Sequence, residues 1–368
     1  ENDCNTIASH VYDTWLIDQQ SRSAWEASMS SALKLATQVS EAKNFPWPNC
    51  SNVKFPLITI AALQFHARAY SALLPGPDIV KCRNYGSDPD GVEAARAQRI
   101  SEHMSYQVTE EDEAWEEVHD RILITVPIVG CAFKKVYFSP ELGHNVSEFV
   151  PAKDLYVPYF AATLETASRL TQVIECLPNA MVSYVRKGLY LPDVLDTDPQ
   201  DSGDGSELRQ TQDRVQGLTE GPQDCDRPYE LLERHGWLDL DGDGYQEPYV
   251  ITIRKDTKQL CRIVARFYSR DILRNRKGEV TCISPSHHYE KYSFIPSPDG
   301  GIYDLGWGIL LGPLNESINT AINQLIDAGT LATTGGGFLG RGARIRSGNV
   351  ALKPFEWVRV DSTGDDLR

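Results

Sequence analysis

The stretch "GPLNESINTAINQLIDAG" at residues 312–329 predicts a long amphipathic helix, from which the rest of the chain can be interpreted. Apolar residues recur along it at intervals of three or four, so they share one narrow stripe of the helix. Gly312-Pro313 either starts this helix or kinks a longer one that begins near Tyr303. The stripe comprises Trp307, Leu311, Leu314, Ile318, Ala321 and Leu325. The polar positions opposite or flanking it are Asn315, Glu316, Asn319, Asn323, Gln324 and Asp327.

Two arrangements fit a helix that is buried on one stripe and polar elsewhere. It can be an ordinary amphipathic helix that packs on its own domain, or one member of a barrel of neighbouring helices around a water-filled channel. The segment from Pro313 to Ala328 spans about 24 Å at roughly 1.5 Å per residue. The pattern alone leaves both arrangements open.

A glycine-rich loop follows this helix directly. Gly335, Gly337 and Gly340 match G-x-G-x-x-G, the pattern of loops that hold phosphates. A dinucleotide site needs a strand before the glycines and a helix after them, whereas here the helix comes first and a predicted strand pair at 343–360 follows. No Lys-Ser or Lys-Thr completes a Walker A loop. We therefore expect a tight turn after a helix end, with a nucleotide-binding enzyme as the alternative.

A second motif, "DLDGDGYQEPY" (239–249), has the spacing of the first half of an EF-hand calcium loop. Its twelfth position is Val250, where a bidentate glutamate is needed, and its flanks predict strands rather than helices. We interpret it as an Asp- and Gly-rich hairpin turn, and keep a calcium-dependent interaction module at 239–247 as an alternative. Its weak candidate metal ligands are Asp239, Asp241, Asp243 and Glu247.

The remaining pattern indicates an α+β fold, with helices concentrated in the first third and strands in the middle. The stretch 56–75 is the longest apolar run, and His66 and Arg68 within it favour a buried helix over a membrane span. The polar stretch 193–226 has few apolar side chains to bury, so we expect it to be a loop on the surface of the protein. Further helices are predicted over 6–42, 92–125 and 179–187, a β-hairpin over 129–158 around "SPELGHN", and strands over 229–267.

The composition excludes few classes of protein, but the net charge limits which partners this chain can bind. The 368 residues are 41% hydrophobic and 24% charged, enough for two or three domains, and the net charge is −15. Such an acidic chain is poorly suited to gripping DNA phosphates, although it can surround DNA without holding it. The chain opens on Glu1 rather than Met, so we expect the natural N-terminus to be missing or processed. The eight cysteines form no C-x-x-C pair, which favours reduced thiols.

No constellation commits the chain to catalysis. His287 and His288 lie beside Ser284 and Ser286 in a turn-rich segment, without a nucleophile elbow or a catalytic cysteine signature. No pair of carboxylates stands out from the general acidity. We therefore expect a protein that is not an enzyme and has no cofactor.

Several stretches together resemble the portal (head-to-tail connector) proteins of tailed bacteriophages, in particular those of short-tailed phages. Each motif is weakly specific, but their order along the chain, from about 50 to 360, is strongly specific. They are "GCAFKKVYFSPELGHNVSEFVPAKDLYVPY" (130–159), "DLDGDGYQEPYVITI" (239–253), "YSFIPSPDGGIYDLGWGILLGPLNESINTAINQLIDAG" (292–329) and "GGGFLGRGARIRSGNVALKPFEWVRV" (335–360).

The resemblance implies a homo-oligomeric ring, typically of twelve copies, at one capsid vertex of the virion, assembled in the host cytoplasm. Double-stranded DNA would pass non-specifically through its channel during packaging and ejection. Implied partners are the terminase large subunit, the head-tail adaptor and tail proteins, and the major capsid and scaffolding proteins, with no membrane. Portal proteins have no catalytic centre of their own.

The same resemblance implies a division of the chain. Residues 1–150 would form a mostly helical wing, 151–300 the rest of the wing and a β-rich clip, 301–332 a stem helix, and 333–368 a β-hairpin region. That region leads towards a tunnel loop and crown, which the family has beyond the position of Arg368. The polar positions of the stem helix would line the channel. Candidates for phosphate or inter-subunit contacts are Arg341, Arg344, Arg346, Lys353 and Arg359.

Overall fold

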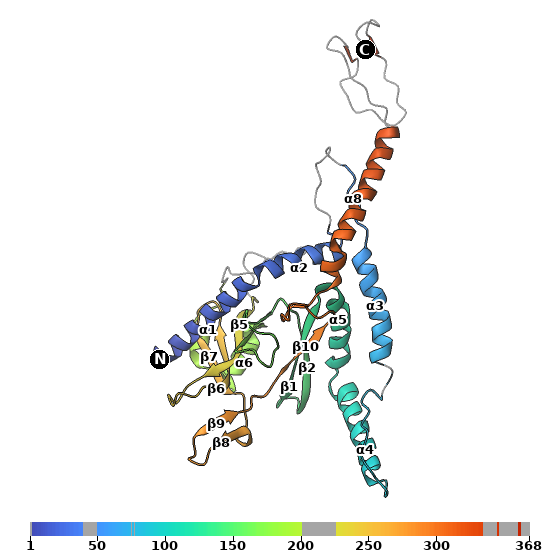
Figure 1. Cartoon of the computed structure of the whole chain (residues 1–368). Coiled ribbons are helices and arrows are strands. Elements are labelled where there is room, and N and C mark those ends of the chain that lie inside the picture. The colour runs from blue at the N-terminus through green and yellow to red at the C-terminus, as the bar shows by residue number, and fades with distance from the viewer. Residues whose placement is uncertain are drawn as a thin grey trace.

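A broad body of sheets and helices carries one long helix that projects away from it (Figure 1). The computed structural model describes residues 2–39, 50–74, 76, 78–200 and 226–333, and two short strands at 344–345 and 360–361. Helices and antiparallel sheets are both extensive, so the expectation of an α+β fold is confirmed. Within the described residues, no helix is both long and apolar enough to cross a bilayer.

The larger sheet has five antiparallel strands in the order β3-β4-β5-β6-β7. Its alternating residues serve two cores, because successive side chains of a strand point to opposite faces. Leu232 packs beneath α1 (Asn2–Ser21), whereas Leu231 faces α6 (Pro178–Arg186). The strands are β3 (Leu155–Tyr156), β4 (Leu170–Cys176), β5 (Tyr229–Leu238), β6 (Glu247–Arg254) and β7 (Leu260–Ala265).

A short 3-10 helix, Pro192–Leu195, completes the α6 side of this sheet. Val194 within it is fully buried and packs in the same cluster as Leu231. The prediction that 193–226 has little to bury is therefore wrong at its beginning, because this apolar side chain covers the sheet. Residues 201–225 lie outside the described part.

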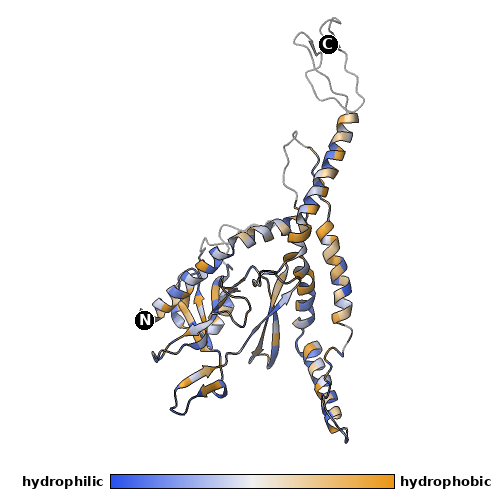
Figure 2. Cartoon of the chain, in the orientation of Figure 1, coloured by the Kyte–Doolittle hydropathy of each residue, from blue (hydrophilic) through white to orange (hydrophobic). Residues whose placement is uncertain are grey.

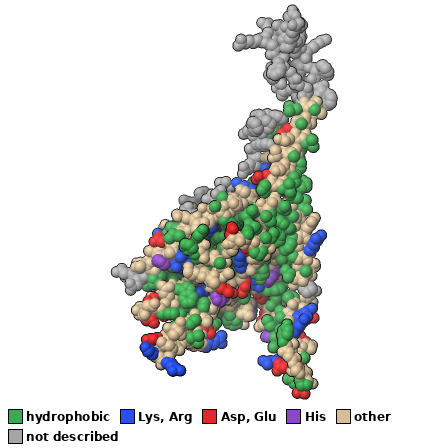
Figure 3. Space-filling model, in the orientation of Figure 1, with side chains coloured by type: hydrophobic (Ala, Val, Ile, Leu, Met, Phe, Trp, Pro, Cys, Tyr) green, Lys and Arg blue, Asp and Glu red, His purple; other side chains and the backbone are tan. Residues whose placement is uncertain are grey.

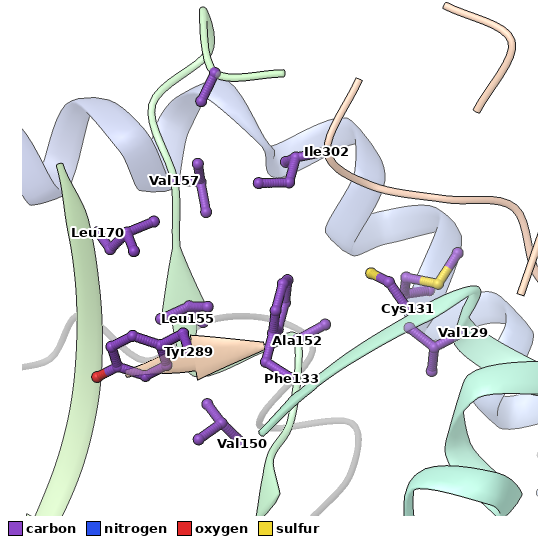
Figure 4. Packing of buried hydrophobic residues seen from close by; sticks show 12 residues of the cluster. Val129, Cys131, Phe133, Val150, Ala152, Leu155, Val157, Leu170, Tyr289 and Ile302 are labelled. Atoms are coloured by element: carbon purple, nitrogen blue, oxygen red, sulfur yellow. The ribbon is translucent and has the colours of Figure 1, made fainter. Parts of the chain in front are cut away.

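The smaller sheet has the order β10-β1-β2, with β1 (Cys131–Ser139) and β2 (His144–Val150) forming the predicted hairpin. β10 (Tyr289–Ser293) pairs with β1, so the regions assigned to 1–150 and 151–300 share one sheet. α5 (Ala114–Val129) covers one face of this sheet. The main apolar cluster lies on the other side, where side chains of β1, β2, β3 and β10 meet (Figure 4).

The predicted helix over 6–42 is divided into α1 and α2 (Ser23–Ala36) by Arg22. This arginine is buried, and its Nη1 donates to the carbonyls of Ala152 (2.9 Å) and Leu155 (2.8 Å). Its guanidinium also lies 3.5 Å from the ring centroid of Tyr156. The two helices therefore separate at Arg22, the residue that joins them to the backbone of residues 152–155 at the start of β3.

The predicted helix over 92–125 is also divided. α4 (Val92–Tyr106) passes into a π-helical turn, Gln107–Glu111, and α5 begins at Ala114. The helix predicted over 56–75 is α3 (Leu57–Leu73), and the one predicted over 179–187 is α6. Two small two-stranded antiparallel sheets contain the remaining strands. They are β8 (Ile272–Arg274) with β9 (Val280–Ile283), and β11 (Arg344–Ile345) with β12 (Val360–Asp361).

A buried ionic network joins the two main sheets. The Glu233 carboxylate of β5 accepts hydrogen bonds from Lys135 Nζ of β1 (2.8 Å) and Tyr289 OH of β10 (3.3 Å). It also lies 3.1 Å from His235 Nε2. Burial opposes the charged form of Glu233, but the bond from His235 and the charge of Lys135 outweigh it and hold its pKa well below the usual range. Burial lowers the pKa of His235 to about 4.

We expect this network to make the fold acid-sensitive. His235 is charged below about 6.5 in the unfolded chain but stays neutral down to about 4 in the folded chain. The unfolded chain therefore binds more protons, and stability falls as the pH drops through this window. Between pH 7 and pH 5 the free energy of unfolding should fall by about 1–2 kcal/mol on account of this residue. Below that, protonation of Glu233 should lower it further.

Urea unfolding at the two pH values measures this effect. His235→Gln should reduce the difference, and a remainder is expected because burial also lowers the pKa of His10 and of His119. An undiminished pH dependence in His235→Gln would contradict the assignment.

Candidate assembly surface

α8 (Trp307–Thr333) is one helix of 27 residues, and Pro313 lies inside it rather than at its start. At roughly 1.5 Å per residue it is about 40 Å long. Its first residues are held in the body, where the indole of Trp307 meets Phe65 (centroids 6.0 Å apart) and Phe294 (4.9 Å) edge-to-face. The later turns leave the body and project beyond it (Figure 1).

Two glycines allow the close approach at this base. A Cβ on Gly308 would lie 2.3 Å from the Ala32 Cβ of α2, and one on Gly306 would lie 2.4 Å from the Ile128 carbonyl oxygen of α5. Real Cβ atoms do not approach other atoms so closely, so both positions require glycine. The root of α8 is therefore fixed against two other helices by backbone contact.

The polar row of α8 is buried in the chain's own structure, which corrects the expectation that it faces a channel. The segment 50–55 lies along α8 before α3 begins, and it binds three members of this row. The physical reason is that extended backbone offers N–H groups that these side chains satisfy. The four buried members are Asn315, Asn319, Asn323 and Asp327.

Three of these side chains accept backbone N–H groups in a regular ladder. Asn319 Oδ1 accepts from Phe55 N (2.7 Å). The Asn323 amide binds Val53 twice: Oδ1 accepts from the N–H (2.7 Å) and Nδ2 donates to the carbonyl (3.0 Å). At the far end, the Asp327 carboxylate accepts from the amide of residue 51 (2.8 Å).

The ladder works because two repeats nearly coincide. Four residues of α-helix rise about 6.0 Å, and two residues of extended chain advance about 6.6 Å. Every fourth side chain of α8 therefore meets every second amide of the segment. One side of α8 therefore binds the backbone of this segment as a neighbouring β-strand would.

The apolar stripe of α8, predicted to be buried, is largely exposed beyond the base of the helix. Leu314 is 54% exposed and Leu325 is 76% exposed. α3 was predicted to be buried, but it also presents apolar side chains to solvent, among them Ile60 and Leu63 (51% exposed). Figures 2 and 3 show apolar residues along both helices. The periodicity located the stripe, but nothing else in the described chain covers it.

The third side of α8 is polar and exposed. Glu316 and Gln324 lie there, so two of the six predicted channel-facing residues remain accessible. They line a shallow groove together with Pro313, Ser317, Thr320 and Ala321. α8 therefore has three distinct sides. One is hydrogen-bonded to segment 50–55, one is apolar and one is polar.

The other predicted contact residues are not brought to this surface by the described structure. The side chains of Arg341, Arg344, Arg346, Lys353 and Arg359 fall outside the described part, as do the three glycines of the loop. The order of elements around the glycine-rich loop matches the prediction. α8 comes before the glycines, and the paired strands β11 and β12 come after them.

The acidic motif forms the predicted hairpin turn, which connects β5 to β6. The carboxylates of Asp239, Asp241 and Asp243 offer oxygens that all lie within 4.8 Å of one another. Asp239 accepts the N–H groups of Gly242 (2.7 Å) and Gly244 (3.0 Å). The structure thus brings together three of the four candidate metal ligands as one cluster, and Glu247 begins β6 beside them.

Sequence reasoning missed the segment that binds the polar row. The available signal was the repeat Asn315, Asn319, Asn323, Asp327, in which three amides and one carboxylate recur every four residues on one side of a helix. Asn and Asp side chains carry oxygens that accept N–H groups, so a row of them can bind an adjacent backbone segment.

No protein-family model matches this chain, and no curated protein matches its sequence significantly. Its function is therefore inferred from the surfaces of α8 and α3 and from the resemblance carried by its motifs.

Proposed function

We propose that this chain is the subunit of a phage portal, a ring at one capsid vertex through which genomic DNA is packaged and ejected. The observation that carries the proposal is the uncovered apolar stripe of α8, on a helix that projects from a folded body. A ring places a neighbouring copy against each such helix, so that every stripe is buried by repetition of one contact.

The energetics support association. Soluble monomers rarely expose large continuous apolar patches, and such patches mark interaction sites. Fully burying one leucine side chain contributes about 1.5–3 kcal/mol. Leu314, Leu325 and Leu63 alone therefore offer several kcal/mol per contact, repeated at each subunit of a closed ring.

The charge of the chain supports conduction of DNA rather than its retention. Twelve copies at −15 each carry about −180 in formal charge, and an acidic channel wall repels phosphates at short range. The polar side of α8, with Glu316 and Gln324, is the side we assign to the channel. Asp327 is withdrawn from that role because its carboxylate binds the chain's own backbone.

In this proposal, the terminase motor docks on the ring during packaging and adaptor or tail proteins replace it afterwards. Capsid and scaffolding proteins surround it at the vertex. The β-rich region before α8, including the β8–β9 hairpin, is the part we assign to contacts with the motor and tail.

Native mass spectrometry of the full-length protein, with particle images, tests the proposal. We expect a closed ring of about twelve copies with a central hole. Leu314→Glu combined with Leu325→Glu should shift the population to monomers, because it places charges in the subunit contact. Gln324→Glu adds a charge on the polar side of the same helix and should leave the ring intact.

A full-length protein that stays monomeric would contradict the portal assignment. Rings that survive the double leucine change but not Gln324→Glu would place the contact on the polar side of α8 instead.

A further inference from the structure

The turn between β5 and β6 concentrates negative charge without a cation to balance it. Three carboxylates of Asp239, Asp241 and Asp243 offer oxygens within 4.8 Å of one another. None of the ion pairs formed among the described residues includes any of them. An acidic turn on its own is common, so a second feature is needed to indicate a ligand.

That second feature is Glu247, the first residue of β6. This residue is only 9% exposed, and its Oε2 atom is buried without a hydrogen-bond partner. Glu247 pairs with Leu238 across the hairpin, so it lies directly after the acidic turn and opposite the residue that precedes Asp239. A buried, unpaired carboxylate oxygen beside three other carboxylates is unfavourable by itself, and a bound cation would remove the penalty.

We propose that the β5–β6 turn binds a calcium ion. The ligands would be the carboxylates of Asp239, Asp241 and Asp243, the Tyr245 carbonyl, and Glu247 either directly or through a water. An all-oxygen set suits Ca²⁺, whereas Mg²⁺ demands near-ideal octahedral geometry and Zn²⁺ favours nitrogen and sulfur ligands. Val250 stands where a bidentate glutamate would complete the set, so water must fill the remaining positions and the affinity should be modest.

The site would connect two parts of the fold. Tyr245, in the middle of the turn, accepts the backbone N–H of Ile283 at its hydroxyl oxygen (3.2 Å). Ile283 is the last residue of β9 and is buried. An ion that orders the turn would thereby also restrain the β8–β9 hairpin. This inference does not depend on the portal assignment, because it rests on the turn alone.

Calorimetric titration of the EDTA-stripped, full-length protein with CaCl₂ tests it. Half-saturation is expected at about 0.1–1 mM, the range of weak calcium modules. Asp241→Asn combined with Asp243→Asn should weaken binding at least tenfold, because asparagine keeps the acceptors of the turn but removes two charges. Glu247→Gln should weaken it several-fold, and without calcium it should be at least as stable as the wild type.

The matched control is Glu165→Gln combined with Asp299→Asn, which removes two charges from exposed carboxylates elsewhere. It should bind CaCl₂ like the wild type, and MgCl₂ should bind more weakly than CaCl₂. Absence of binding up to about 10 mM CaCl₂ would overturn the proposal. Equal weakening by the two double variants would also overturn it, because binding would then reflect general attraction to an acidic chain.

Discussion

Gly306→Ala is expected to lower the free energy of unfolding by about 4 kcal/mol or more. The new Cβ would lie 2.4 Å from the Ile128 carbonyl oxygen and 2.6 Å from Gly130 N. Both are backbone atoms, so no side-chain rotation relieves the overlap, and α8 must separate from α5. Gly130 cannot give way easily, because its N–H donates to the Val126 carbonyl (2.8 Å) and its carbonyl accepts the N–H of Phe294 (2.8 Å).

Urea unfolding measures this effect, and Gly329→Ala provides the control. Gly329 lies within α8, whereas Gly306 directly precedes it, and a Cβ at Gly329 meets nothing within 4 Å. Alanine should therefore stabilise the helix by about 0.5–1 kcal/mol through its higher helix propensity. A Gly306→Ala protein within 1 kcal/mol of the wild type would show that the root of α8 is packed more loosely than described.

The second large effect is expected from Asn323→Leu. This change removes both bonds to Val53 and leaves its N–H and carbonyl facing an apolar side chain. A fully buried group left without a partner costs about 1–3 kcal/mol, and these partly buried groups cost less. Segment 50–55 should therefore detach from α8 at a cost of about 2–4 kcal/mol, limited by the access of water to the freed groups.

Hydrogen exchange of the backbone amides of residues 51, 53 and 55 measures this detachment directly. Protection at these three positions should fall together, while the strands of the five-stranded sheet keep theirs. Gln324→Leu makes a similar change at the next, exposed position and should leave the three amides protected. If Asn323→Leu affects only Val53, the ladder is not cooperative.

Local patterns predicted most of the elements of this fold. The hairpin over 129–158 and the strands on either side of the Asp-rich turn follow from alternation and turn residues, which are local in sequence. The existence of α8 follows from spacing, but its start does not, because the sequence left open whether the helix begins at Gly312-Pro313 or near Tyr303. Helix boundaries were less predictable. Arg22 divides the first helix by binding carbonyls 130 and 133 residues away, and such contacts leave no local signal.

The burial of α8 could not be predicted from its sequence. The spacing of its apolar and polar residues divides the helix into sides, but spacing alone does not say which side the rest of the chain covers. The amide row is buried because Phe55 binds Asn319 across 264 residues of sequence. The exposed leucines have the apolar spacing of a core, and spacing alone does not distinguish a core within the chain from the subunit contact that we propose. The prediction of which side is buried was therefore reversed, although the stripe itself was correctly located.

The ladder between α8 and segment 50–55 also has a mechanical consequence. Its bonds are spaced along the helix axis, so a force that pulls the segment parallel to α8 loads all of them at once. A force that lifts one end of the segment away from the helix loads them one after another, and each breaks under a small load. The attachment is therefore strong in shear and weak in peeling. A segment held in this way resists sliding along α8 but separates readily when it is lifted from the helix.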